Sequence, residues 1–457
     1  MSKRLIMILA LAFVVGIACA AYAEVQNVKV SGDITALGAT RNLNLKGEAN
    51  DGSKSFMATI TRVKIDADLT DNVMATVGLI NERYWGRRVT DNTDATSTNT
   101  DIALNLAFVT MKEFLYSPLT MTVGRQALRF GNAMIVGDPD TNNQASTATA
   151  FGGASRDPDL SVGKAFDAIR ATLDYDPLVI DMVYSKISTN DNNNIANDDT
   201  ALLGVNANYA LNKKTTLEGY WFDKQVGKKA VTAVNQKKAD RVDTVGGRVV
   251  TQATDNIVYQ LEAAYQFGKK ARLAADSSTT KSVNRKAWAL ETAMTYSRPD
   301  KKYTPSMTVC YSYFSGDHEN NAYTTNSGAW RGWDPMFEDQ TSGNIANALF
   351  DQTNAHVIGA ILSAKPKEDI TLKGEYLAYW WAKAFPEGAT SLTRRGDTVA
   401  FTERRFAGQE VDLTATYDYT EDVQFSLLGA MFMPGSAFVK GNDTRATEVI
   451  GSMKVTF

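Results

Sequence analysis

The chain ends with the stretch Ala446-Thr447-Glu448-Val449-Ile450-Gly451-Ser452-Met453-Lys454-Val455-Thr456-Phe457, in which apolar and polar residues alternate. Successive side chains of a β-strand point to opposite faces, so one face carries Val449, Met453 and Phe457 while the other is mostly polar. A terminal aromatic residue is typical of outer-membrane barrels, whose last strand pairs with the first strand to close the cylinder. The alternative is a carboxy-terminal edge strand of a soluble sandwich, and the rest of the chain decides between the two.

Eighteen segments with the same alternation recur along the chain, and helical spacing fits them less well. Each is about ten or more residues long, which is the length that a tilted strand needs to cross a bilayer. We therefore expect an all-β fold: a closed antiparallel transmembrane β-barrel of about 18 strands. The predicted strands are 28–40, 56–69, 73–86, 101–112, 119–130, 165–175, 179–187, 200–210, 215–224, 241–251, 256–268, 286–296, 305–315, 355–364, 370–381, 408–419, 423–433 and 446–457.

The connections between these segments alternate in length. Short ones include Thr70-Asp71-Asn72 and Thr420-Glu421-Asp422, whereas 131–164 and 316–354 are long. Tight turns on one side and long loops on the other are the pattern of bacterial outer-membrane barrels, and an even strand number puts both termini on the short-turn side. A soluble sandwich has no reason to sort its loops in this way. We therefore expect a protein of the bacterial outer membrane, with lipid and the barrel assembly machinery as partners.

The amino terminus has the features of a secretory signal peptide. Two basic residues precede an apolar run over residues 5–18, and the small-residue site Ala21-Tyr22-Ala23 follows. We expect residues 1–23 to be removed and residues 24–457 to form the barrel as one domain. A lipoprotein site at Cys19 is the alternative, although the residues before it lack the large aliphatic side chain that such a site needs.

Composition excludes several classes of function. The net charge of -3 is close to neutral and argues against a nucleic-acid partner. Without Cys19 the chain keeps one cysteine, Cys310, and can form no internal disulfide. The two histidines, His318 and His356, lie in no recognisable catalytic motif, and no haem, metal or phosphate-binding motif is present. We therefore predict no enzyme activity, no catalytic residues, no cofactor and no metal.

Alternation identifies the side chains that should face the lumen. They include both signs of charge, and rings of charge set the ion preference of a pore. A simpler interpretation is that these charges pair across adjacent strands, or that neighbouring carboxylates form a hydrated wall. The lumen-facing candidates are Arg62, Lys64, Asp66, Arg170, Arg248, Glu262, Glu291, Lys373, Glu375, Glu410 and Asp412.

Five motifs together resemble the alginate export porin family, and they span most of the chain. They are Val123-Gly124-Arg125-Gln126-Ala127-Leu128-Arg129-Phe130-Gly131-Asn132, Phe166-Asp167-Ala168-Ile169-Arg170, Tyr313-Phe314-Ser315-Gly316-Asp317, Trp333-Asp334-Pro335-Met336-Phe337 and Gly408-Gln409-Glu410-Val411-Asp412-Leu413. The resemblance implies an eighteen-stranded outer-membrane barrel. The namesake of the family passes an anionic polysaccharide through an arginine-rich constriction.

The resemblance adds Arg125 and Arg129 to the candidate pore-lining residues, together with Arg170. Strict alternation from Val123 instead puts Arg125 on the lipid face, where arginine is costly at mid-bilayer. We therefore expect either a bulge near Gly124 or a position beyond the apolar band. The acidic share of the wall is larger than an alginate channel would need.

Three functions remain in comparison. The first is a passive channel for hydrophilic, anionic solutes or oligosaccharides. The second is a structural sheath that holds a secreted or electron-carrying partner protein in its lumen, since eighteen strands enclose an aqueous space. The third, an outer-membrane enzyme, lacks a catalytic constellation. A long loop, 131–164 or 316–354, that folds inward would favour the channel, whereas a clear lumen would favour the sheath. The sequence leaves the solute, the ion selectivity and the oligomeric state open.

Overall fold

The computed structural model describes most of the chain after the amino-terminal segment. The predicted signal peptide, residues 1–23, lies outside the described residues. The described ranges are 27–46, 53–86, 102–141, 157–188, 199–227, 230–231, 234–235, 239–273, 280–317, 328–393 and 398–457.

Eighteen antiparallel strands form the wall of a closed barrel, as predicted, and each predicted segment overlaps one of them. In chain order they are β1 (Asn27–Asn42), β2 (Ser53–Thr70), β3 (Val73–Tyr84), β4 (Ala103–Met111), β5 (Leu119–Ala127), β6 (Ala165–Asp174), β7 (Leu178–Ser188), β8 (Thr200–Asn212), β9 (Thr215–Val226), β12 (Asp240–Thr254), β13 (Ile257–Leu273), β15 (Ala287–Ser297), β16 (Ser306–Phe314), β17 (Ala355–Lys367), β18 (Ile370–Trp381), β21 (Phe406–Asp418), β22 (Val423–Pro434) and β23 (Ala446–Thr456).

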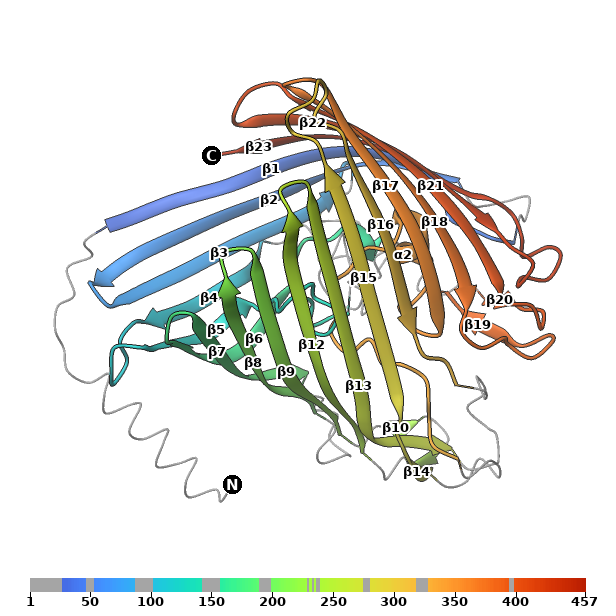
Figure 1. Ribbon diagram of the computed structural model, residues 1–457, viewed down its shortest axis with the longest axis horizontal. Coiled ribbons are helices and arrows are strands. Elements are labelled where there is room, and N and C mark those ends of the chain that lie inside the picture. The colour runs from blue at the N-terminus through green and yellow to red at the C-terminus, as the bar shows by residue number, and fades with distance from the viewer. Residues whose placement is uncertain are drawn as a thin grey trace.

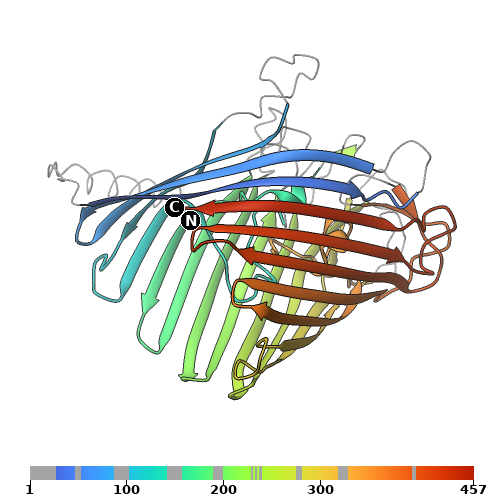
Figure 2. The same ribbon diagram turned by 90° about the horizontal axis from the view of Figure 1, so that it is seen from above.

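The barrel closes because the last strand pairs with the first. Strand β23 lies antiparallel to β1, with Gly451 opposite Gly38. The two views show the blue β1 beside the red β23, with the other strands between them in colour order (Figures 1 and 2). The backbone of Phe457 exchanges hydrogen bonds of 2.9 and 3.0 Å with that of Gly32. Every wall strand therefore has two neighbours, which leaves no unpaired strand edge facing lipid.

The remaining elements lie in or beside the long connections. Strand β14 pairs with the far end of β13, and β19 pairs with β20. No helix among the described residues has the length and apolar character of a membrane-spanning segment. These elements are β10 (Ala230–Val231), β11 (Val234–Asn235), β14 (Thr280–Asn284), β19 (Thr390–Leu392), β20 (Thr398–Ala400), the 3-10 helix η1 (Pro158–Leu160) and the α-helix α2 (Asn344–Leu349).

The two faces of the wall differ as alternation requires. On the outer face of β21, β22 and β23, the side chains of Leu413, Leu427 and Val449 are more than half exposed. On the inner face of the same strands, Glu410 and Glu448 are buried. An exposed apolar face around a closed barrel is the surface that lipid covers. Buried carboxylates on the inner face show that something occupies the lumen.

Candidate functional site

Three segments from long connections fold into the lumen and pack against the inner wall. We call residues 128–141, 157–164 and 328–353 the plug. Strand β5 was predicted to run to residue 130, but it ends at Ala127, and the chain leaves the wall there. Buried plug residues such as Met134, Phe337 and Leu349 share one apolar cluster with inward-facing wall residues such as Phe222. The long connections 131–164 and 316–354, singled out from the sequence, therefore both contribute to the plug.

The first and third plug segments are joined by backbone pairing. Val136 forms a parallel β-bridge with Phe337. The amide of Phe337 donates to the carbonyl of Ile135 at 3.0 Å, and the amide of Gly137 donates to the carbonyl of Phe337 at 2.7 Å. The amide of Asp339 likewise donates to the carbonyl of Ala133 at 2.9 Å. These bonds satisfy backbone groups that are buried inside the barrel, so the two segments form one unit.

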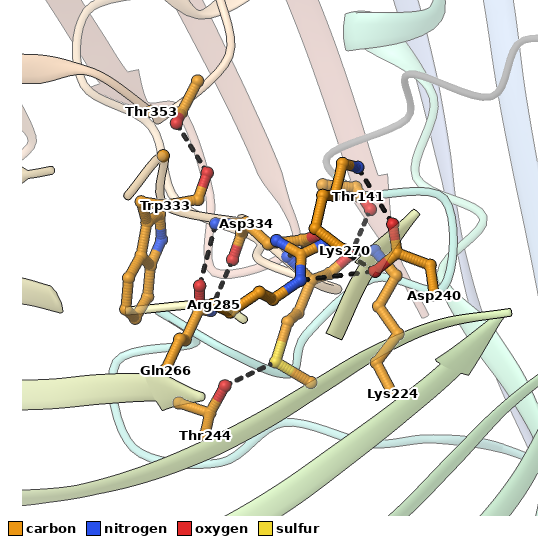
Figure 3. A network of polar contacts seen from close by, with 12 residues as sticks. Thr141, Lys224, Asp240, Thr244, Gln266, Lys270, Arg285, Trp333, Asp334 and Thr353 are labelled. Carbon is orange, nitrogen blue, oxygen red and sulfur yellow. Dashed lines mark hydrogen bonds and ion pairs between the residues drawn. The ribbon is translucent and has the colours of Figure 1, made fainter. Parts of the chain in front are cut away.

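Asp334 fixes this unit to the wall on one side (Figure 3). Its carboxylate lies 3.0 Å from Lys224 Nζ on β9 and 3.4 Å from Arg285, which sits between β14 and β15. Its backbone N–H and C=O both bond to the side chain of Gln266 on β13, at 2.9 and 2.7 Å. Burial disfavours the ionised carboxylate, but the charges of Lys224 and Arg285 outweigh it and hold the pKa of Asp334 below its usual range.

Neighbouring residues complete the contacts around Asp334. Thr353 Oγ1 donates to the carbonyl of Trp333 at 2.6 Å, and Thr141 Oγ1 donates to the carbonyl of Met336, also at 2.6 Å (Figure 3). Thr244 Oγ1 lies 2.9 Å from Met336 Sδ. The segment around Asp334 is therefore held at side chains and at backbone together.

The short helix α2 is held at another part of the wall, on β21, by two carboxylates. Glu410 accepts hydrogen bonds from the backbone amides of Ile345 and Ala346, at 2.7 and 2.8 Å. Asp412 accepts two from Asn344, at 2.7 Å from the side-chain amide and 3.2 Å from the backbone. The first amides of a helix have no partner within the helix, and negative charge at this end is favourable. These carboxylates thus anchor the helix, and the hydrated wall expected at Glu410 and Asp412 is wrong.

The second plug segment, 157–164, is held by Arg41 on β1. The Arg41 guanidinium is 1% exposed and bonds to Asp157 at 3.0 Å, to Asp159, and to Glu448 on β23. A guanidinium group stays charged at all ordinary pH values, and its several N–H donors can bond to three carboxylates at once. Arg41 can therefore be buried while charged. Sequence analysis missed Arg41, because the predicted strand ended at residue 40 and the alternation was not extended to it.

Two further candidate acids, Glu262 and Glu291, lie buried on the inner wall. Glu262 and Glu291 face each other on β13 and β15. Tyr220 donates to Glu262 at 2.8 Å, and the side-chain amide of Gln340 in the plug donates to Glu291 at 2.7 Å. Both acids are buried: Glu291 holds the plug through Gln340, whereas Glu262 bonds to the neighbouring wall strand through Tyr220.

The basic candidates on the inner wall each have a carboxylate partner. The pairs are Arg62 with Asp33 at 2.7 Å, Lys64 with Asp66 at 2.8 Å, Arg170 with Asp181 at 2.7 Å, Arg248 with Glu218 at 3.4 Å, and Lys373 with Glu375 at 2.6 Å. Arg129 lies in the plug, where it bonds to Asp339 at 2.6 Å, and Lys164 bonds to the same carboxylate. Three of the five wall pairs join adjacent strands, as the simpler interpretation expects, whereas Lys64–Asp66 and Lys373–Glu375 each lie within one strand.

Arg125 requires a correction, because the register turns it away from the lumen. It lies opposite Asp167, on the face that carries Val123 and the exposed Ile169, and it bonds to Asp167 at 3.1 Å. The pairing of β5 with β4 and β6 is continuous through Gly124, so the expected bulge is absent. Arg125 instead lies near the long-loop end of β5, where an outward-facing charge can leave the hydrocarbon region. It is not a pore-lining residue.

Comparison with known proteins agrees with this geometry. The family model described as alginate export matches residues 38–452. The chain belongs to the alginate export family. Its place is therefore the bacterial outer membrane, where its apolar outer face meets lipid. Among curated proteins, none matches this chain.

Solved structures of outer-membrane porins share the fold of this alginate export family member at low sequence identity. OccK5 (OpdH) of Pseudomonas aeruginosa is 12% identical, with a TM-score of 0.54 over 95% of this chain and 99% of that chain. OccAB1 of Acinetobacter baumannii is 11% identical, with a TM-score of 0.56 over the same shares.

The motifs that carry the family resemblance turn out to be plug contacts. Asp334 and Glu410, from two separate motifs, anchor the plug to different parts of the wall. Phe166, from a third motif, packs edge-on against Phe337 at 6.2 Å between ring centroids. Arg170 lies over the ring of Phe130. In this member of the family, the shared motifs therefore specify how the lumen is filled.

Proposed function

We propose that this protein is a passive outer-membrane channel for small hydrophilic solutes, and that its lumen favours anions. The plug supports a channel over the sheath alternative. Its residues fill the part of the lumen that a partner protein would need, and contacts to several wall strands hold them there. Solutes pass between the plug and the charged inner wall, and the plug limits their size.

The observation that carries the anion preference is the unequal exposure within the wall ion pairs. Lys64 is 45% exposed where Asp66 is 18% exposed, and Lys373 is 44% exposed where Glu375 is 14% exposed. The arginines at positions 62, 170 and 248 are likewise more exposed than their acidic partners. A solute therefore meets the basic end of each pair first. In a narrow lumen, charged groups that face water raise the local concentration of ions of the opposite sign, here anions.

The proposal does not include catalysis. His318 lies outside the described residues, and His356 is on the outer face, where its Nδ1 lies 2.9 Å from the hydroxyl of Tyr311. His356 also packs against the ring of Tyr313, within a group of aromatic side chains near the long-loop end. Such rings are typical of the membrane interface.

The test is the reversal potential of single channels in a salt gradient across a planar bilayer. The wild-type protein should prefer anions, and the K64Q/K373Q variant should shift toward cations. The matched control is K214Q, because Lys214 pairs with Asp255 at a short turn outside the lumen. A cation-selective wild-type channel, or equal reversal potentials for wild type and K64Q/K373Q, would remove the anion preference from the proposal.

A further inference from the structure

A row of ring side chains crosses four wall strands on the outer face, near the long-loop end of the barrel. Tyr313 on β16 lies opposite His356 on β17. Trp380 on β18 lies opposite His356 on one side and opposite Phe406 on β21 on the other. Tyr379, the chain neighbour of Trp380, bonds to the plug. Successive side chains of a strand point to opposite faces, so the row faces lipid.

The rings of this row pack on one another. The centroids of Tyr313 and His356 are 4.7 Å apart, and those of Trp380 and Phe406 are 5.4 Å apart. Trp288 on β15 extends the row, at 4.3 Å from Tyr313. Rings with a polar edge favour the interface between membrane and water, and the long loops of such barrels lie on the outer side of the outer membrane. The row therefore lies at the level of the lipid headgroups of the outer leaflet.

Arg405 is fixed at the end of this row, immediately before Phe406. Its Nε donates to the carbonyl of Trp381 at 2.9 Å, and its Nη2 donates to the carbonyl of Ala382. The amide of Trp381 donates in return to the carbonyl of Arg405 at 2.8 Å. A guanidinium has five N–H donors, so these two bonds hold its orientation and leave donors for a ligand.

The charge of Arg405 is exposed and is not neutralised by an acid. Within the described part of the chain no carboxylate pairs with it, whereas Arg170 and Arg248 on the inner wall each have an acidic partner. The charge lies close enough to the rings of Tyr313 and His356 to act on both of them. A planar fork of free donors is well suited to bind phosphate.

We propose that Arg405 and the row of rings bind a phosphate-bearing lipid of the outer leaflet. The phosphate accepts hydrogen bonds from the free donors of Arg405, and the exposed Arg404 adds positive charge beside it. The acyl chains lie along the apolar outer face of β17 and β18, where Ile358 and Tyr376 are exposed. An uncharged lipid would leave the donors of Arg405 without an anion.

The occupant is a lipid and not a dissolved anion because of where the guanidinium lies. It stands beside rings that face the membrane, so a ligand there contacts apolar side chains as well as the charge. A lipid with a phosphate in its headgroup has both parts in the right order, with the charge toward water and the chains toward the bilayer. The site lies outside the lumen and is independent of the proposed channel.

Binding can be measured by native mass spectrometry on the whole protein, refolded in a neutral detergent so that it carries no membrane lipid. The probes are lipid A, a phosphorylated glycolipid of the outer leaflet, and the same lipid after enzymatic removal of its phosphates. Lipid A should bind saturably, and the dephosphorylated lipid should bind about tenfold more weakly, as expected for lost charge-assisted hydrogen bonds. Inorganic phosphate should not displace lipid A any more than sodium chloride of equal ionic strength does.

R405Q should weaken the binding of lipid A about tenfold and leave that of the dephosphorylated lipid within about twofold of wild type. A purely structural role of Arg405 would weaken both alike. The matched control is R125Q, which should keep the preference for phosphate, because Arg125 faces outward near the same end of the barrel but is paired with Asp167. R405K is the second variant, in case R405Q does not fold. It keeps the charge without the planar fork, so its preference for phosphate should be reduced.

The proposal fails if lipid A does not bind saturably, if the wild type binds both lipids equally, or if the folded Arg405 variant keeps the full preference for phosphate. Displacement of lipid A by inorganic phosphate would indicate a site for free anions in place of a lipid site. An equal loss of preference in R125Q and R405Q would mean that the charge of the whole barrel governs binding, and not the position of Arg405.

Discussion

The carboxylate of Asp334 in the plug lies 3.0 Å from Lys224 Nζ on the barrel wall, with both side chains mostly buried. Because Arg285 contacts the same carboxylate, one loop residue carries the charge that joins the plug to β9 and to the β14–β15 strand break. The pKa of Asp334 is lowered, so its attachment is present above the usual aspartate range and is lost only as the pH falls through the lower folded-state pKa.

The D334N variant should open the channel without unfolding the barrel. Loss of the charge leaves Lys224 and Arg285 without this partner, which weakens the attachment by about 3 kcal/mol. Single-channel conductance and current noise should both rise, while heat-modifiable gel mobility stays that of a folded barrel. The control is D300N, because Asp300 pairs with Arg298 in a short turn outside the lumen. Wild-type conductance in D334N would mean that this ion pair does not hold the plug closed.

E410Q should loosen α2 and expose the lumen below it. Glutamine offers one acceptor oxygen in place of the two that Glu410 presents to Ile345 and Ala346, so about 1.5–3 kcal/mol of attachment is lost. The native Cys310 can report access to this part of the lumen. It lies on the same face of β16 as Ser312, which bonds to Glu291, a residue that contacts the plug. Cys310 is two residues closer than Ser312 to the short-turn end of the strand.

A charged thiol reagent added on the long-loop side should therefore label Cys310 slowly in the wild type and faster in E410Q. E421Q, in an exposed short turn, is the control for the substitution type. Equal labelling rates in E410Q and wild type would show that the Glu410 contacts do not limit access through the lumen.

Gly32, which lies between β2 and the terminal Phe457, should not tolerate one added methyl group. A Cβ at Gly32 would lie 2.3 Å from the carbonyl oxygen of Arg62 and 2.8 Å from the ring of Phe457, whereas a Cβ at Gly38 has its nearest neighbour at 3.9 Å. G32A should therefore lower the folded fraction in outer membranes, measured by heat-modifiable mobility, and G38A on the same strand face should not. Deleting Phe457 should lower it too, because the Gly32 backbone loses its partner. Equal folded yields for G32A and G38A would contradict this account of the packing around Gly32.

Much of the fold could be predicted because each wall strand of a barrel alternates apolar and polar residues with a period of two. The alternation at Val449, Met453 and Phe457 identifies a wall strand whatever fills the lumen. The plug contacts could not be predicted in the same way. Asp334 was noticed only as part of a motif, since its partners Lys224 and Arg285 are 110 and 49 residues distant in the chain (334 − 224 and 334 − 285). No local pattern brings such residues together; only the closed wall does.

Variants of the wall arginines can show whether the anion preference comes from the exposed bases of the ion pairs or from the net charge of the wall. Arg170 is 33% exposed and bonds to Asp181, which is 8% exposed. R170Q alone should shift the reversal potential toward cations, but it also leaves Asp181 without its cation. The decisive variant is R170Q/D181N, which keeps the net charge of the wall and removes the exposed base together with the buried acid.

If the exposed end of each pair sets selectivity, R170Q/D181N should still shift toward cations, by less than R170Q, because the water-facing positive charge is gone. If only net charge matters, its reversal potential should equal that of the wild type. D181N alone completes the cycle and should shift toward anions. Reversal potentials in a salt gradient separate these outcomes, with folding checked by gel mobility. A wild-type reversal potential in the folded R170Q/D181N variant would show that exposure within the ion pairs does not govern which ions enter.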